Sequence, residues 1–160
     1  MMRKLCLALL ALTAASPVAG EVVGYRGPWR LERVANGCSM TFKAEQGGSV
    51  LVGLPSNAPD KAMIVFTDPA WQSLVVGQTY PLQVKLGNTS MPVTASALVY
   101  EGDKGIRFLM DRKTLLSATA SALSVIRDGA VITGYHFHHD DDAFYALVSC
   151  AGQDTDPFAK

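Results

Sequence analysis

Residues 80–86 read Tyr-Pro-Leu-Gln-Val-Lys-Leu, and this stretch decides the fold class. Its apolar residues occupy every second position, which is the pattern of a strand with one face in a core and the other in water. The same alternation recurs over residues 38–43 and 106–110, and short apolar runs lie at 50–52 and 63–66. The sequence therefore predicts a domain built mainly from β-strands.

Turn residues join these strands into hairpins. Asn36-Gly37 predicts a tight turn within a hairpin over 29–44, and Asp128-Gly129 predicts another between 123–126 and 131–137. A further turn at 101–105 follows a strand over 93–100. Because hairpins join antiparallel neighbours, we expect a mostly antiparallel sheet.

Two segments change to helical spacing. Asp111 is placed to cap the first helix, in which four residues share one face: Leu115, Thr119, Ala122 and Leu123. The second helix is expected over about Asp141 to Cys150, with Gly152 ending it. The sequence thus predicts an α+β fold, a β-sandwich or partly open barrel of about eight strands with two packed helices.

The N-terminus has the features of a secretory signal peptide over residues 1–20. Arg3 and Lys4 precede an apolar stretch over 5–15, and small residues follow up to Gly20. A short membrane anchor or a buried strand are the alternatives. Cleavage would leave one domain over 21–152 and a loose tail over 153–160, with no membrane span in the mature protein. The expected location is periplasmic or secreted.

The charge balance argues against a nucleic-acid binder, and the cysteine usage agrees with export. The 160 residues hold 14 basic and 14 acidic side chains, and no basic run marks a nucleic-acid surface. Removing Cys6 with the signal peptide leaves Cys38 and Cys150, which predict a disulfide between the two ends of the domain. A reactive thiol pair is the alternative, but the sequence has no C-x-x-C motif.

The three histidines of the chain lie within four residues. His136, His138, His139 and Asp140 could hold zinc, copper or nickel as nitrogen and oxygen ligands. In the competing structural interpretation the histidines form the polar face of a strand. The carboxylates at 140–142 would then be N-cap and first-turn residues of the last helix.

Recognised catalytic signatures are absent from the sequence, among them G-x-S-x-G, H-E-x-x-H and a Gly-rich phosphate loop. Trp29 and Trp71 are interpreted as core residues, with a ligand-stacking role as the alternative. We therefore assign no catalytic residue and no resident cofactor.

Several segments resemble small exported proteins of unknown activity from Gram-negative, particularly alphaproteobacterial, bacteria. The segments are Trp29, Cys38-Ser39-Met40, residues 71–74 with Gly77 and Tyr80, and the ending from Asp128-Gly129 through residues 143–147 to Cys150. The chain is also similar to the invasion-associated locus B proteins. The resemblance implies a periplasmic location and no established catalytic residues.

These observations predict a small non-enzymatic binding or interaction protein outside the cytoplasm. An inhibitor of a wall-acting enzyme or an immunity-type protein would fit. The expected partner is another periplasmic or extracellular protein, or a small ligand. A metal-binding protein that uses the histidine cluster and an enzyme of unrecognised type are the alternative hypotheses.

Overall fold

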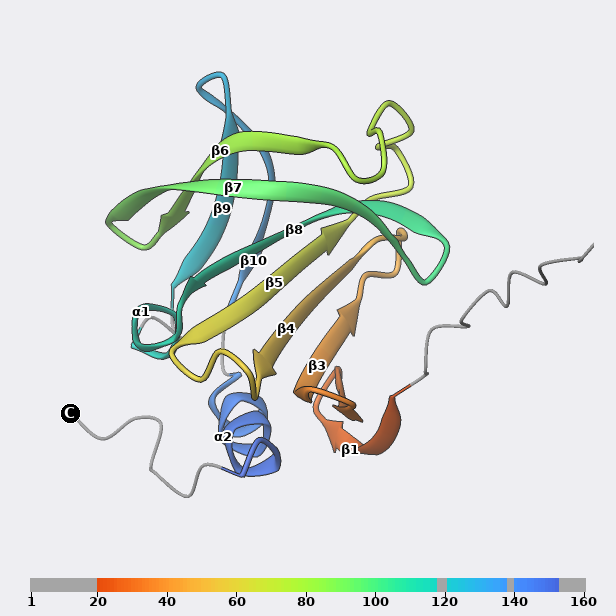
Figure 1. Ribbon diagram of the computed structural model, residues 1–160, viewed down its shortest axis with the longest axis vertical. Helices are drawn as coiled ribbons and strands as arrows, with labels where there is room; N and C mark the ends of the chain where they lie inside the picture. Colours follow the sequence, from red (N-terminus) through yellow and green to blue (C-terminus); the bar gives the residue numbers. More distant parts are fainter. Residues whose placement is uncertain (1–19, 118–120, 138–139, 153–160) are drawn as a thin grey trace, which may run out of the picture.

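The computed structural model describes residues 20–117, 121–137 and 140–152, which form ten strands and two helices (Figure 1). The elements in chain order are β1 (Glu21–Arg26), β2 (Trp29–Val34), β3 (Gly37–Lys43), β4 (Ser49–Pro55), β5 (Lys61–Thr67), β6 (Thr79–Leu86), β7 (Thr89–Tyr100), β8 (Asp103–Asp111), α1 (Arg112–Leu116), β9 (Ala122–Arg127), β10 (Ala130–His136) and α2 (Asp141–Cys150).

All ten strands belong to one antiparallel sheet in the order β1-β2-β3-β4-β5-β8-β7-β6-β9-β10. The sheet is not closed, since β1 and β10 are its two edges. This confirms the predicted α+β class with a mostly antiparallel, partly open sheet, although there are ten strands where about eight were expected.

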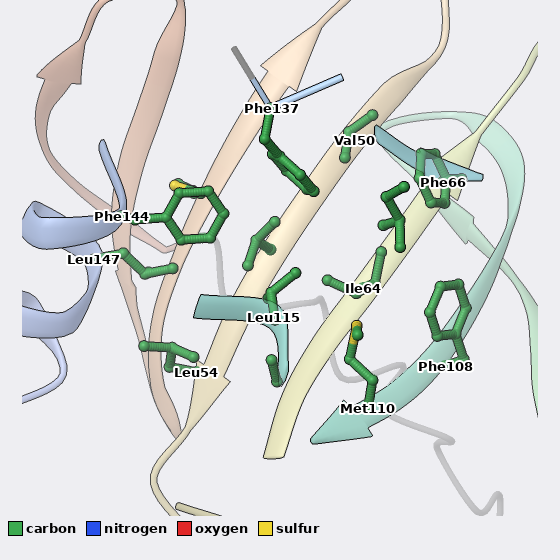
Figure 2. Packing of buried hydrophobic residues seen from close by; sticks show 14 of the residues in the cluster. Val50, Leu54, Ile64, Phe66, Phe108, Met110, Leu115, Phe137, Phe144 and Leu147 are labelled. Carbon is green, nitrogen blue, oxygen red and sulfur yellow. The ribbon is translucent and has the colours of Figure 1, made fainter. Parts of the chain in front are cut away.

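The sheet bends so that its two ends share one core. The ring of Trp29 in β2 packs edge-on against Tyr135 in β10, with 5.3 Å between centroids. Helix α2 contacts β1 to β4, whereas α1 contacts β5 and β8. Figure 2 shows Phe137 and Phe144 in the same packed cluster. Trp29 is only 1% exposed, which confirms it as a core residue.

The predicted hairpins and the second helix are confirmed, although the loop of the first hairpin is Ala35–Asn36 rather than Asn36-Gly37, because Gly37 already pairs with Val34 as the first residue of β3. The β9–β10 turn has Asp128 and Gly129 at φ 52° and 81°, the left-handed values that an Asp-Gly turn of the type I′ family requires. Helix α2 spans Asp141–Cys150, and Gly152 beyond it has a φ of 71°. Trp71 is partly buried against the core.

The first helix is shorter than the sequence predicted. Asp111 caps it as expected, because its Oδ1 accepts a hydrogen bond of 2.8 Å from the Thr114 N–H. The prediction was wrong for Ala122 and Leu123, which belong to β9. Leu123 is buried by strand alternation with Val125, and both face the core. Thr119 lies outside the described residues.

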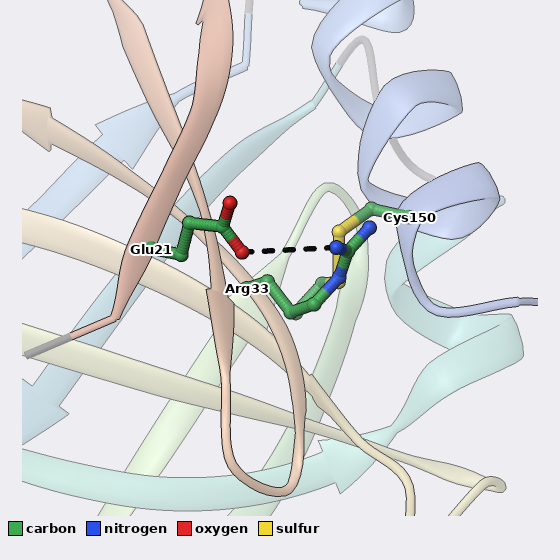
Figure 3. The surroundings of a disulfide bond; sticks show 4 residues. Glu21, Arg33 and Cys150 are labelled. Atoms are coloured by element: carbon green, nitrogen blue, oxygen red, sulfur yellow. Dashed lines mark ion pairs between the residues drawn. A yellow bond between two sulfur atoms is a disulfide. The ribbon is translucent and has the colours of Figure 1, made fainter. Parts of the chain in front are cut away.

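The predicted disulfide joins Cys38 of β3 to Cys150 of α2, with 6.0 Å between their Cα atoms (Figure 3). Beside it, Arg33 Nη1 lies 3.8 Å from Glu21 Oε2, so the ion pair links β2 to β1. The bond fixes the end of α2 to the sheet across 112 residues of sequence.

Two further predictions concern the chain ends. Residues 1–19, most of the expected signal peptide, and the tail at 153–160 lie outside the described residues. Within the described part, no helix is long and apolar enough to cross a membrane.

Candidate functional site: a groove beside strand β6

A groove of about 500 Å³ lies where the β9–β10 hairpin separates from β6. In Figure 1 the tip of this hairpin projects beyond β6 at the top of the molecule. The groove is lined by residues of β6, β7 and the β9–β10 hairpin: Pro81, Leu82, Gln83, Pro92, Ile126, Arg127, Asp128 and Gly129. Its volume is within the range of small ligand sites.

The groove begins at Pro81 for a backbone reason. The pairing of β6 with β9 covers Gln83 to Leu86, and the next residue, Gly87, donates its N–H to the Ala122 carbonyl at 3.1 Å. Alternate residues of a strand present their backbone groups to the same side, so Pro81 also faces β9. Proline has no N–H to donate there, so the β6–β9 ladder does not extend to Pro81 and ends at Gln83.

Four residues form a transverse row on the outer face of the sheet beside this groove. The register places Pro92 opposite Gln83, Gln83 opposite Ile126, and Ile126 opposite Val131. We call these four residues the outer row. Strands lie about 4.8 Å apart, so the outer row spans about 14 Å.

The outer row is apolar at three of its four positions and open to solvent. Pro92 and Gln83 are exposed, Ile126 is half-buried, and Val131 is 66% exposed. Their neighbours along the strands point into the core, as Val84 and Val125 do. The row is therefore an apolar strip on a sheet whose opposite face is already packed.

Tyr80 holds the arginine at the end of the groove. The Arg127 guanidinium carbon lies 5.5 Å from the centroid of the Tyr80 ring, in cation–π geometry. The Tyr80 hydroxyl accepts a hydrogen bond from the Val75 N–H at 3.3 Å and donates one to Gln78 at 3.2 Å. Tyr80 thus fixes Arg127 to the loop that precedes β6.

The described members of the histidine segment, His136 and Asp140, lie away from the groove, at the end of β10 and at the start of α2. Phe137 is fully buried and Tyr135 packs on Trp29, so the expected core face of this strand is confirmed. His136 ends β10 on the exposed side, and Asp140 is the N-cap residue of α2, 7% exposed.

The metal prediction remains untested. His138 and His139 lie outside the described residues, and within 20–117, 121–137 and 140–152 no three His, Cys, Asp or Glu side chains are close enough to hold a metal.

Burial and the neighbouring Asp140 carboxylate raise the pKa of Tyr135 to about 12.

Sequence reasoning missed the groove and the outer row. The signal that could have found them is Pro81 and Pro92 inside alternating segments, because proline within a strand marks an edge or an interrupted ladder. Which residues stand opposite one another depends on the strand register.

Comparisons of the chain with protein-family models, with curated proteins and with solved structures each returned no match.

Proposed function

We propose that this chain is a small exported binding protein that holds a segment of a partner polypeptide on the outer row and in the groove beside it. One observation carries the proposal. Three apolar side chains, Pro92, Ile126 and Val131, are aligned by register across β7, β6, β9 and β10 and remain open to solvent. Exposed apolar side chains gathered on one face of a protein often mark a site that binds another protein.

Two features of the groove support this proposal. In the groove, the contact with Tyr80 holds the Arg127 side chain in place, so that binding there costs less conformational entropy. Tyrosine and arginine are also the residue types that contribute most often to binding hot spots. The signal-like N-terminus and the Cys38–Cys150 disulfide support an oxidising compartment as the place of action.

Site-specific photocrosslinking in the native host tests the proposal. A benzophenone amino acid is placed at Gln83 in the outer row, and in a second variant at Tyr145, which is 58% exposed on α2. We expect an adduct of one defined mass from position 83 that Val131→Ser abolishes. No adduct from position 83, or the same adduct from both positions, would contradict the proposal.

A further inference from the structure

We propose that a second copy of this chain pairs with strand β1, so that the two β1 strands run antiparallel and join the two sheets across a two-fold axis. This inference goes beyond the proposed function and does not depend on it, because β1 and the outer row lie on different strands of the sheet. Its basis is the order of charged and apolar residues along β1, together with the β-bulge at Val23.

Strand β1 is an open edge of the sheet (Figure 1). All of its residues except Gly24 are exposed. The apolar side chains among them belong to Val22, Val23 and Tyr25, which are 48%, 38% and 63% exposed. The strand holds no proline and no lysine, the residue types that commonly prevent pairing at an edge. An apolar edge of this kind is a template for a further strand.

The β-bulge at Val23 brings the two charged residues of β1 to the same face. The register places Glu21 opposite Arg33 of β2. At the other end of the strand it places Arg26 opposite Trp29. These two β2 residues are four positions apart, so Glu21 and Arg26 share a face. In a regular strand, residues five positions apart would point to opposite faces, so the extra residue is what aligns them.

Val22 and Tyr25 lie together on the opposite face. Val22 stands opposite Glu32 of β2. Tyr25 stands opposite Arg30, two residues before Glu32 and therefore on the same side. Both β2 residues alternate with the buried Trp29, so Val22 and Tyr25 face away from the core.

The backbone groups of Val22 and Tyr25 point to the free edge. Arg26 ends β1 at a two-residue loop, and the hydrogen bond of that turn directs its backbone groups to β2. Glu21 pairs with a β2 residue four positions further on, so its backbone groups face β2 as well. Because backbone groups alternate between the two sides of a strand, those of Tyr25 and Val22 face away from β2.

Strand β1 is complementary to itself in one antiparallel register. Full overlap of the two six-residue strands places residue 21 opposite 26, 22 opposite 25 and 23 opposite 24. Glu21 then meets the second copy's Arg26 on one face, and the two-fold axis repeats this ion pair. On the other face Val22 meets Tyr25, a β-branched and aromatic combination that stabilises cross-strand pairs. A shift of the register by one residue loses both kinds of pair.

Glu21 and Arg26 can make these contacts without giving up those within one chain. Glu21 Oε2 lies 3.8 Å from Arg33 Nη1, and the Glu21 side chain is 74% exposed (Figure 3). Arg26 Nη1 donates a hydrogen bond of 2.8 Å to the carbonyl of Tyr25. A carboxylate has two acceptor oxygens and a guanidinium has five N–H donors, so both groups keep capacity for a partner in the second copy.

Sedimentation velocity of the disulfide-bonded protein from about 1 to 500 µM tests the proposal. Two six-residue strands make a small interface, so we expect a reversible dimer with a dissociation constant on the order of 10–100 µM. The exchange of the Tyr25 amide proton, followed by NMR, should slow as the protein concentration rises, because its N–H would donate to the second copy's Val22.

Charge-swap variants test the register. Glu21→Arg places two arginines opposite each other at both ends of the paired strands, and Arg26→Glu places two glutamates there. Each should weaken the dimer at least about fivefold. The double variant Glu21→Arg/Arg26→Glu restores opposite charges and should return the dissociation constant to within about twofold of the original. Glu45→Arg is the matched control, since Glu45 is exposed in the β3–β4 turn.

Every outcome decides. A chain that stays monomeric up to the highest concentration would overturn the proposal. A dimer that both single swaps leave intact, or that the double swap fails to restore, would show that β1 does not pair in this register and would overturn it as well. Photocrosslinking from Gln83 tests the proposed function separately, because it does not involve β1.

Discussion

Reduction of the Cys38–Cys150 disulfide should remove a large share of the stability of this fold. The bond closes 112 residues of sequence, from β3 to the end of α2. Chain entropy alone then assigns it about 5 kcal/mol of unfolding free energy at 25 °C. With an m value of about 1.5 kcal/mol per molar urea, the unfolding midpoint should fall by about 3 M.

The assay is urea unfolding followed by circular dichroism, with and without a phosphine reductant. The m value is fitted separately for each form, because the reduced unfolded chain is less compact. Arg33→Gln is the control, since it removes only the exposed 3.8 Å ion pair with Glu21 beside the bond and should cost under about 1 kcal/mol. A midpoint shift below 0.5 M on reduction would refute the argument that this long closed loop stabilises the domain.

Three further predictions concern stability. Phe144→Ala should lower the unfolding free energy by about 3–5 kcal/mol, because Phe144 is fully buried. Tyr145→Ala, at the neighbouring exposed position, should lower it by much less. Chemical denaturation of both variants measures the difference. Asp111→Ala removes the N-cap of α1 and should cost about 1 kcal/mol, measured as a lower melting temperature. Folding raises the pKa of the Tyr135 hydroxyl to about 12, above the usual tyrosine value of about 10. As the pH rises, the unfolded chain therefore loses this proton before the folded protein does, and the unfolding free energy should fall between about pH 10 and 12. Tyr135→Phe should reduce that fall; the same pH dependence in the variant and the unsubstituted protein would contradict the assignment.

The sequence predicted the fold where local pattern and final burial coincide. Residues 80–86 alternate because every second residue enters the core, and helix α2 follows its 3.6-residue spacing. Strand β1 gave no such pattern, since Val22 and Val23 are consecutive and both are exposed at the sheet edge. Ala122 and Leu123 fitted a helical face as well as a strand, and pairing of Leu123 with Leu86 of β6 decided between them.

The candidate site was harder to predict for a physical reason. Gln83 and Pro92 are far in sequence from the hairpin that carries Ile126 and Val131, and each of the four is an ordinary exposed or half-exposed position of its own strand. They become one surface only through the register of three strand pairs. Strand alternation gives the face of each residue, but a shift of two residues in any pair would keep every face and disperse the row.

The affinity of a matched pair of variants tests the binding surface most directly. The partner captured at position 83 is purified and titrated against Val131→Ser and Leu109→Ser, which both shorten an exposed aliphatic side chain. If the outer row holds the partner, Val131→Ser should weaken binding about tenfold and Leu109→Ser less than twofold. Equal affinities for the two variants would contradict the account.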